Sequence, residues 1–319
     1  MDRRTLLGGT AVLAAGGLAL SPSASPSADD GVYVERLGER QIMVWTRRPG
    51  HLWIRYDLRH FTDPDKRMDA WRIQGISAVS SPAPQLRIRQ AGPPPATGAV
   101  TLLTTAGAYP FAIKPEGAKD HFGGIHGDEL LRSVLFLADG RSVNPSGVTR
   151  AEEFELAQDT EVFDPAAAAP TPLGLVNVRH VFTADGLRIR WVLRWTAART
   201  IIYAYGAMLP AVRDEAVTSW FRYLDQAGEQ DISRTGHGAK PSDSFGVQMY
   251  NRKNGLAMSV EVEPGFFNGF TQSDRRGIWV YDGDTYNKVY PTRVSLPGRE
   301  QVAAGDVWEL DAFYRFFYP

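Results

Sequence analysis

The stretch Val178-Arg-His-Val-Phe-Thr-Ala-Asp-Gly-Leu-Arg-Ile-Arg-Trp-Val-Leu-Arg-Trp195 decides the fold class of this chain. Polar and apolar residues alternate on both sides of Asp185-Gly186, and Asp-Gly between alternating runs is a strong short-range signal for a β-hairpin. A two-residue turn there sets His180 opposite Trp191. Because successive side chains of a strand point to opposite faces, the hairpin has an apolar face and an arginine-rich face. The apolar face holds His180, Phe182, Ile189 and Leu193, and the other face holds Arg179, Val181, Thr183, Arg188, Arg190 and Arg194.

The same alternation recurs along most of the chain, where turn residues such as those at 252–255 and 282–284 separate the runs. Strands are predicted at residues 32–34, 42–45, 52–58, 85–89, 100–104, 200–208, 245–250, 256–262, 278–281, 286–290 and 306–317. Many short strands with regularly spaced turns are typical of an antiparallel sandwich. The chain is therefore predicted to be all-β, an antiparallel two-sheet jelly roll or large β-sandwich, formed by one domain over residues 29–319.

Helical periodicity is scarce and limited to two segments. Residues 127–138 fit a helix but equally predict a strand over 132–138, and residues 213–224 are a weaker helix candidate. The segment 164–172 is rich in Ala and Pro. We interpret it as a long crossover between the two sheets, with a linker between domains as the alternative.

Residues 1–28 have the composition of an export signal. Arg3-Arg4 precede an apolar run of small residues that ends near Leu20, and a Ser- and Pro-rich exit follows to Ala28. A basic start, an apolar core and a small-residue end are the parts of a secretory signal. The paired arginines resemble a twin-arginine signal, which exports folded proteins. We expect a secreted or periplasmic protein that is not membrane-bound after signal removal; an uncleaved membrane anchor is the alternative.

The composition excludes several classes of function. The 319 residues carry a formal net charge of −1 and no cysteine. A nucleic-acid partner is therefore not indicated, and thiolate chemistry is excluded. The 8 Trp and 12 Tyr residues suit a β-rich core, and they equally suit a surface on which sugar rings stack. We expect a polysaccharide or oligosaccharide partner and no cofactor, with calcium or zinc as open alternatives; the oligomeric state is not indicated.

The densest group of reactive side chains lies in His121-Phe-Gly-Gly-Ile-His-Gly-Asp-Glu129. It combines two imidazoles and two carboxylates with three glycines, which allow sharp turns and the close approach of a ligand. Imidazole has the side-chain pKa nearest neutrality, and a neighbouring carboxylate fixes its tautomer. We predict that His126, Asp128 and Glu129 line an active site and that His121 binds substrate. The alternative is a structural turn.

A second polar face is predicted near the C-terminus. Alternation puts Tyr286, Lys288 and Tyr290 on one side of a strand, although Tyr and Lys both require polar partners. We predict that Tyr290 acts as an acid, with Lys288 lowering its pKa. Polar groups beside aromatic rings suit sugar hydroxyls. The predicted substrate contacts are accordingly His121, His180, Arg190, Arg194, Gln248, Tyr250, Asn268 and Tyr286.

Two of these segments resemble the jelly-roll polysaccharide lyases. Tyr286-Asn-Lys-Val-Tyr290 is similar to the C-terminal Tyr-x-Lys-x-x-x-Tyr strand of the jelly-roll alginate lyases, and Gly124-Ile-His126 resembles their Gln-Ile-His strand. The resemblance implies β-elimination on a uronate-containing polymer. That reaction needs a cation to neutralise the uronate carboxylate, a base for the C5 proton and an acid for the leaving oxygen. We assign these roles to Arg190 or Arg194, to His126 and to Tyr290.

Three other interpretations stay open. His126-Gly-Asp-Glu129 and Asn144-Pro-Ser-Gly147 resemble the His-x-x-Glu motif and the Asn-Pro-Asp-Gly turn of the zinc carboxypeptidase superfamily. That resemblance implies an α/β fold and a zinc-dependent amidohydrolase or peptidase with His126 and Glu129 as ligands. A glycoside hydrolase would use a pair of carboxylates from Asp128, Glu129, Glu261 and Glu263. A non-catalytic carbohydrate-binding protein would need only the aromatic rings.

Overall fold

The computed structural model of the chain describes residues 31–48, 52–80, 100–104, 107–145, 147–213, 217–233, 238–267 and 277–317. The export signal predicted at 1–28, the strand predicted at 85–89 and the predicted substrate contact Asn268 lie outside these ranges. The described elements are β-strands and two 3-10 helices, η2 (Pro64–Lys66) and η3 (Pro264–Phe267), which confirms the all-β prediction. Within the described ranges, no helix is long and apolar enough to cross a membrane.

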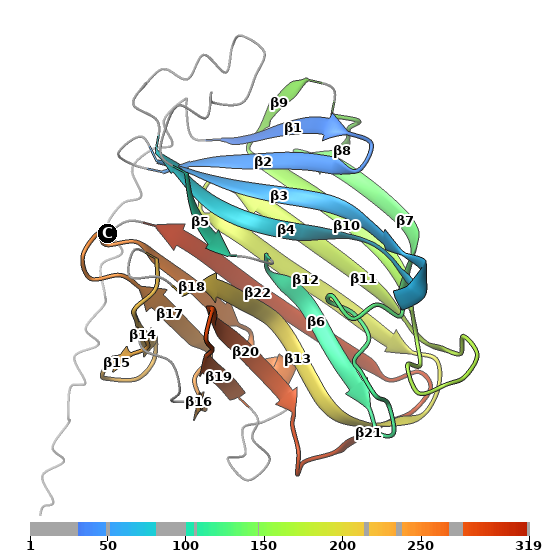
Figure 1. Cartoon of the computed structure of the whole chain (residues 1–319). Helices are drawn as coiled ribbons and strands as arrows, with labels where there is room; N and C mark the ends of the chain where they lie inside the picture. The colour runs from blue at the N-terminus through green and yellow to red at the C-terminus, as the bar shows by residue number, and fades with distance from the viewer. Residues whose placement is uncertain are drawn as a thin grey trace, which may run out of the picture.

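The strands are stacked in two layers, which we call the front and back layers as they appear in Figure 1. In pairing order, the front layer contains β9 (Val148–Ala151), β1 (Val32–Gly38), β2 (Gln41–Arg48), β3 (Leu52–Asp63), β4 (Met68–Ser80) and β5 (Val100–Thr104). Both β5 and β6 (Tyr109–Pro115) pair with β13 (Arg199–Val212), and the order continues from β13 to β20 (Tyr286–Val294), β19 (Gly277–Asp282) and β16 (Gly238–Ser242), while β21 (Glu300–Val302) also pairs with β13.

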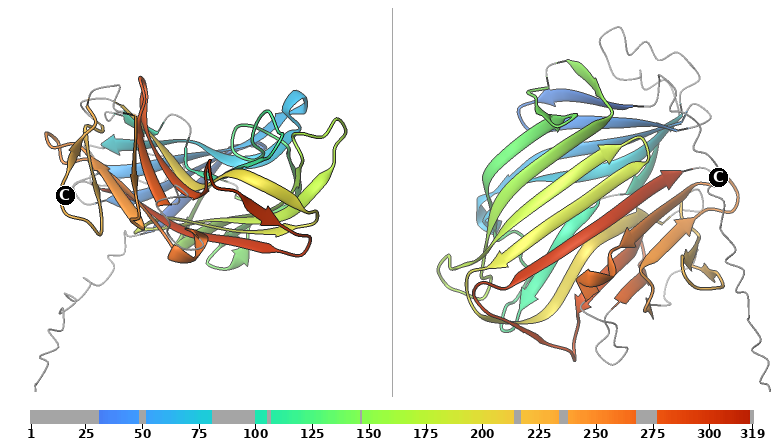
Figure 2. Two further views of the ribbon diagram at one scale, coloured as in Figure 1. Left: turned by 90° about the horizontal axis from the view of Figure 1, so that it is seen from below. Right: turned by 180° about the vertical axis from the view of Figure 1, so that it is seen from behind.

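The back layer is equally extended and is seen from behind in Figure 2. In pairing order, it contains β8 (Arg141–Ser142), β7 (Glu129–Ala138), β10 (Glu153–Phe163), β11 (Pro172–Thr183), β12 (Gly186–Trp195), β22 (Val307–Phe317), β18 (Ala257–Val262), β17 (Gly246–Tyr250), β14 (Trp220–Tyr223) and β15 (Gln230–Asp231). These pairings are antiparallel. A short parallel pairing between β4 and β7 joins the two layers along one edge.

The core lies between the layers and is rich in aromatic rings. Trp191 of β12 meets Phe111 of β6 with ring centroids 5.8 Å apart, and its indole N–H donates to the carbonyl of Pro110 at 2.8 Å. Trp195 meets Phe122 at 6.1 Å. Each such ring buries a large apolar area, which stabilises the packing of one layer on the other. Side chains on the other side of β6 or β12 therefore point outward, away from the opposite layer.

The predicted hairpin is formed by β11 and β12, with a register that differs by two residues from the prediction. His180 pairs with Ile189, because Ala184 and Asp185 make the turn and Gly186 already pairs with Thr183. A Cβ on Gly186 would lie 2.2 Å from the carbonyl oxygen of Tyr314, so the chain passes too close to β22 for a side chain there. A shift of two residues keeps each side chain on its predicted face. The apolar face is buried, and the arginines point outward.

Two other local predictions are corrected, and one open alternative is decided. Residues 129–138 form strand β7, which confirms the strand alternative for this segment, because pairing with β10 provides their backbone hydrogen bonds. The second helix candidate contains strand β14 instead. The segment 164–172 does not cross between sheets, because it joins β10 to β11, which are neighbours in the back layer. The α/β fold implied by the zinc carboxypeptidase resemblance is absent from the described residues.

Candidate functional site

The predicted histidine loop connects the two layers. It leaves the front layer at the end of β6 and enters the back layer at Glu129, the first residue of β7. Phe122 anchors it, because its backbone N–H and C=O both bond to Ile113 of β6, at 2.8 and 3.1 Å. The Phe122 ring is fully buried against Phe111 and Trp195. The buried Phe122 therefore fixes the backbone of the loop, and the polar residues before and after it, Asp120, His121 and His126, are held in place at the surface.

The glycines of this loop are required by the protein's own packing. Gly123 has φ +78°, and a Cβ there would lie 2.2 Å from the ring of Phe111. Gly127 has φ +98°, and a Cβ would lie 2.0 Å from the carbonyl oxygen of Lys66. The predicted sharp turns are confirmed. The close approach that they allow is to neighbouring backbone and rings.

Asp120 lies between the two histidines of the loop. Its Oδ1 is 2.8 Å from Nδ1 of His126 and 3.4 Å from Nδ1 of His121, and it also accepts the backbone N–H of His121 at 2.8 Å. The two imidazole rings have centroids 4.8 Å apart. The carboxylate beside His126 is thus supplied by Asp120, which the sequence analysis did not single out, instead of by Asp128 or Glu129.

Burial favours the neutral form of both imidazoles. It lowers the pKa of His121 to about 4, assisted by His126 and opposed by Asp120. Burial also lowers the pKa of His126, with Asp120 opposing the shift and Lys288 and Arg72 adding to it. For Asp120, burial raises the pKa, but the N–H of His121 and the imidazole of His126 outweigh it, so the net shift is downward. At neutral pH a carboxylate therefore lies beside two neutral imidazoles.

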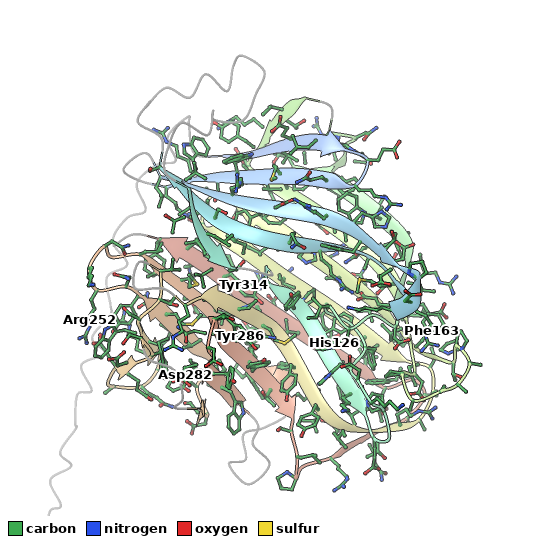
Figure 3. All side chains as sticks on the ribbon, viewed as in Figure 1. His126, Phe163, Arg252, Asp282, Tyr286 and Tyr314 are labelled. Carbon is green, nitrogen blue, oxygen red and sulfur yellow. The ribbon has the colours of Figure 1, made fainter. Side chains whose placement is uncertain are left out.

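Tyrosines and a lysine from three strands, β6, β13 and β20, extend this group across the outer face of the front layer. The His121 ring lies 5.8 Å from Tyr205 of β13, and the Tyr205 ring lies 5.1 Å from Tyr290 of β20. Nζ of Lys288 lies 4.4 Å from the Tyr290 ring centroid. Figure 3 shows His126 beside β6. We call this group the outer-face cluster: Tyr109, Asp120, His121, His126, Tyr203, Tyr205, Lys288 and Tyr290.

The structure corrects the predicted effect of Lys288 on Tyr290. The ammonium group lies over the ring face, so it makes a cation–π contact. Burial raises the pKa of Tyr290, and neighbouring Tyr286 and Tyr205 raise it further. Burial lowers the pKa of Lys288 to about 8. Tyr290 therefore keeps its proton at neutral pH, and Lys288 loses its proton more easily than an exposed lysine.

Asp128 and Glu129 have arginine partners of their own. Asp128 forms an ion pair with Arg67. Glu129 is buried, lies 3.0 Å from a guanidinium nitrogen of Arg72 and accepts the Thr160 hydroxyl at 3.1 Å. These pairs tie the end of the loop to β4 and β10. The catalytic role predicted for both carboxylates and the zinc-ligand role predicted for Glu129 stay predictions, in competition with this structural use.

Three predicted substrate contacts do not reach the outer-face cluster. His180 is 1% exposed in the core between the layers, and neither ring nitrogen has a hydrogen-bond partner among the described residues. Its placement corrects the prediction that it binds substrate. Arg190 and Arg194 point outward from the back layer, since Trp191 and Leu193 on the alternate face are in the core. The core separates them from His126, so the predicted arginine–histidine constellation is not formed.

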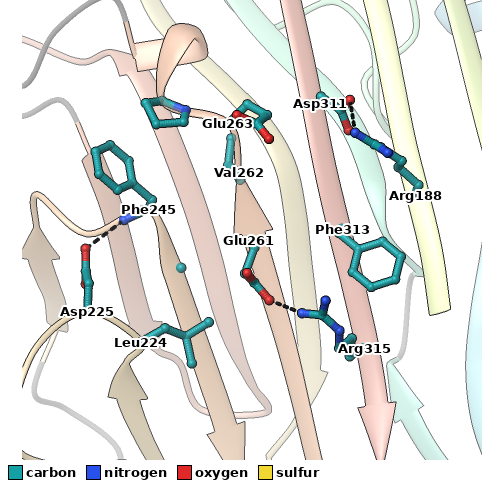
Figure 4. A pocket seen from close by; sticks show the side chains of 12 residues that line it. Arg188, Leu224, Asp225, Phe245, Glu261, Val262, Glu263, Asp311, Phe313 and Arg315 are labelled. Carbon is teal, nitrogen blue, oxygen red and sulfur yellow. Dashed lines mark hydrogen bonds and ion pairs between the residues drawn. The ribbon is translucent and has the colours of Figure 1, made fainter. Parts of the chain in front are cut away.

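The outer face of the back layer has its own pocket, of about 570 Å³. Glu261 and Glu263, the carboxylates considered for glycoside hydrolysis, both line it, together with Phe245 and Phe313 (Figure 4). Most of its charges are paired, because Glu261 bonds to Arg315 and Asp311 accepts two hydrogen bonds from Arg188, both at 2.6 Å.

Two further predicted contacts belong to the back layer. Gln248 of β17 is buried and accepts a hydrogen bond from Arg222 at 2.8 Å. Tyr250 lies two residues further along the same strand, and Glu229 beside it raises its pKa in addition to the effect of burial. Tyr286 begins β20 on the front layer, where it contacts Tyr281. The structure thus divides the predicted contacts between two faces.

The cluster residues that sequence reasoning missed had weak signals. Asp120 directly precedes His121, and Tyr203 and Tyr205 alternate with the buried Ala204 along β13. This alternation predicts that the side chains of both tyrosines point away from the core. Only the pairing of β13 with both β6 and β20 brings them between the histidine loop and Tyr290.

Comparison with known proteins gives distant structural matches. No protein-family model matches the chain, and no curated protein sequence matches it. The galactosidase domain of the alpha-galactosidase–sucrose kinase AgaSK is similar with a TM-score of 0.47 and 12% identity, over 90% of this chain and 42% of that one. The GH36 alpha-galactosidase AgaB from Geobacillus stearothermophilus is similar with a TM-score of 0.45 and 9% identity, over 86% of this chain and 41% of that one.

A third match is close to this chain in length. The Slr1438 protein from Synechocystis sp. is similar with a TM-score of 0.45 and 9% identity, over 88% of this chain and 97% of that one. In contrast, this chain spans less than half of each of the two galactosidases. The function proposed below therefore rests on the residues of this chain.

Proposed function

We propose that this protein is a carbohydrate-active enzyme and that the outer-face cluster is its reactive centre. The observation that carries the proposal is the chain of ring contacts from His126 through His121 and Tyr205 to Tyr290, with centroids 4.8, 5.8 and 5.1 Å apart. It joins two segments that the sequence marks independently as a base and an acid. Partly buried tyrosines provide ring faces for sugars and hydroxyls for their polar groups.

The reaction that this set suits best is β-elimination on a uronate-containing polysaccharide. When Nδ1 of His126 donates to Asp120, Nε2 keeps a free lone pair and takes the C5 proton. The C4–C5 double bond forms as the C4–O bond breaks, and Tyr290 gives its proton to the leaving oxygen. Lys288, instead of Arg190 or Arg194, provides the positive charge for the uronate carboxylate.

Glycoside hydrolysis is the second candidate, and a specific observation favours it. Glu261 and Glu263 lie together in the lining of the back-layer pocket, with phenylalanine rings beside them. A pair of carboxylates is what a glycosidase requires, one as acid and one as base or nucleophile. This candidate uses the opposite face of the molecule and a different set of residues.

The products of the two reactions differ, which provides the test. The purified protein is incubated with a panel of uronate-containing and neutral polysaccharides. Elimination produces unsaturated, ultraviolet-absorbing chain ends, whereas hydrolysis produces reducing ends without that absorbance. We expect the unsaturated product, and we expect His126→Ala to abolish it. Reducing ends that are lost in Glu263→Gln would favour the hydrolase, and binding without either product would favour a non-catalytic carbohydrate-binding protein.

We also propose that the protein is exported by the twin-arginine route, on the basis of Arg3-Arg4 and the apolar run that follows. Replacing both arginines by lysine keeps the charge and is expected to hold the chain in the cytoplasm. Unchanged export of the Arg3→Lys, Arg4→Lys variant would contradict this proposal.

A further inference from the structure

Asp120, His121 and His126 present metal-binding atoms to one point on the surface. One ligand atom from each residue can be chosen so that all three lie within 4.8 Å of one another. We infer that these three side chains form a binding site for a divalent transition-metal ion, best suited to zinc. This set differs from the His126–Glu129 pair of the zinc carboxypeptidase resemblance, because Glu129 is bonded to Arg72 and Thr160.

The spacings from Asp120 to the two imidazoles are close to those of a tetrahedral ion, and the two imidazole donors, which lie within 4.8 Å of each other, would have to turn toward the ion. Zinc bonds to nitrogen and oxygen at about 2.0–2.2 Å, so tetrahedral ligand atoms lie about 3.3 Å apart. Oδ1 of Asp120 lies 3.4 Å from Nδ1 of His121 and 2.8 Å from Nδ1 of His126, so side-chain adjustments of a few tenths of an ångström bring both distances to this value. Imidazole and carboxylate are the zinc ligands available to a chain without cysteine.

The surroundings limit how the site can be completed. Three protein ligands leave a fourth tetrahedral position for water or a substrate oxygen, as in catalytic zinc sites. The Asp120 side chain is 61% exposed, so an ion reaches the site from solvent without any opening of the fold. The anchored Phe122 and the closely packed glycines fix the backbone between the two histidines, which reduces the cost of ordering the ligands.

The hydrogen bonding around Asp120 is crowded on one atom. Its Oδ1 accepts the backbone N–H of His121 at 2.8 Å and is also the atom offered to the Nδ1 atoms of both imidazoles. One oxygen satisfies three donors poorly, whereas an ion between the three side chains would be bound by all of them.

The inference shares His126 with the proposed function but does not rest on it, because zinc binding is measured without substrate. Protein freed of metal with a chelator is titrated with zinc chloride in a calorimeter, and bound zinc is counted by mass spectrometry after dialysis. We expect one zinc per chain. His121→Ala, His126→Ala and Asp120→Asn are each expected to weaken binding by about tenfold or more. His60→Ala is the matched control, because His60 also contacts an aspartate, Asp69, outside the cluster.

A second readout avoids the variants. Zinc should protect His121 and His126 of the unaltered protein from diethyl pyrocarbonate while leaving His60 reactive. Failure of zinc to bind, binding that survives all three substitutions, or equal protection of His60 would each overturn the inference. If His126 is also the catalytic base, zinc should inhibit the metal-free enzyme. Activity that requires zinc would instead support the site and contradict the base role, so the two proposals fail separately.

Discussion

The outer faces of the two layers carry similar residue types in different environments. On the back layer, Arg188 and Arg190 both donate to Asp311, and their side chains are 41% and 46% exposed, so water and a carboxylate balance their charge. On the front layer, burial lowers the pKa of His121 to about 4 and that of Lys288 to about 8. Desolvation, more than the presence of charged or aromatic residues, therefore distinguishes a candidate reactive centre from a solvated face.

The largest expected effect is on catalysis, and it compares a substitution on the outer face of the front layer with one on the outer face of the back layer. His126→Ala should lower kcat/KM by about 10²–10⁴-fold, the usual contribution of a positioned acid or base. Arg190→Ala, on the back layer, should leave it close to the value of the unaltered protein. Initial rates on the polysaccharide of the proposed panel that gives the unsaturated product provide the measurement, with circular dichroism as the check of folding. Full activity in His126→Ala, or an equal loss in both variants, would remove the distinction between the faces.

The next contrast concerns ion pairs. The side chains of Arg72 and Glu129 are 6% and 4% exposed, whereas those of Arg315 and Glu261 are 46% and 45% exposed. Glu129→Gln leaves a buried guanidinium without its charge partner and should lower the free energy of unfolding by about 3–5 kcal/mol. Glu261→Gln should lower it by about 0–1 kcal/mol. Denaturant unfolding of both variants measures the difference; equal losses would show that burial does not separate the two pairs.

A third prediction sharpens the account of the histidine loop. Gly127 and Gly117 both have positive φ, at +98° and +81°, but only at Gly127 would a Cβ meet other atoms, 2.0 Å from the Lys66 carbonyl oxygen. Both alanine variants carry the backbone cost of a left-handed residue. Gly127→Ala should be destabilised by about 1–3 kcal/mol more than Gly117→Ala, through overpacking. Thermal and denaturant melts test this, and a Gly117→Ala loss as large as that of Gly127→Ala would contradict it.

The last contrast concerns the core between the two faces. Burial lowers the pKa of His180 to about 4 from its ordinary value of 6.5. Between these pH values the unfolded chain binds a proton that the folded chain does not, so stability falls as the pH drops from 6.5 towards 4. His180→Leu should remove this contribution, and its advantage over the unaltered protein should grow across that window. Urea melts at several pH values provide the check, and a difference independent of pH would refute it.

Much of the fold was predictable because alternation is a local signal. The strands of the central hairpin, β11 and β12, follow from Val178 to Trp195 directly. The exact register does not, because Gly186 was assigned to the turn, whereas its contact with Tyr314 places it in the strand. Strand β6 escaped prediction because Pro110 and Pro115 interrupt it. It tolerates them because its ladder runs along one side, with β13, and the other side carries the bridge from Ile113 to Phe122, away from both prolines. The sequence of strand β7 fits a helix and a strand equally well, and only its long-range pairing with β10 selects the strand.

The candidate site was predictable in part for the same reason. His121, His126, Lys288 and Tyr290 were identified from local composition, and the structure brings them into one cluster. Asp120 and Tyr205 join that cluster through contacts between segments far apart in the sequence, which no local pattern encodes. Conversely, Arg190 and His180 were assigned to the site from their residue types, which do not reveal which side of a layer a side chain faces. That depends on how the two layers stack.

The path of the histidine loop from one layer to the other has a mechanical consequence. Its first half is fastened to β6 of the front layer by Phe122, and its second half to β10 of the back layer by the bond from the Phe163 N–H to the Asp128 carbonyl, at 2.9 Å. The contact between Asp120 and His126 spans these two attachments, so a shear of one layer over the other would stretch it. A ligand that binds both residues would brace the sandwich against that shear. We expect such a ligand to slow hydrogen exchange at the amides of Phe122 and Asp128, the two residues that anchor the loop. Unchanged exchange at these amides would show that the two layers are already held rigidly without the ligand.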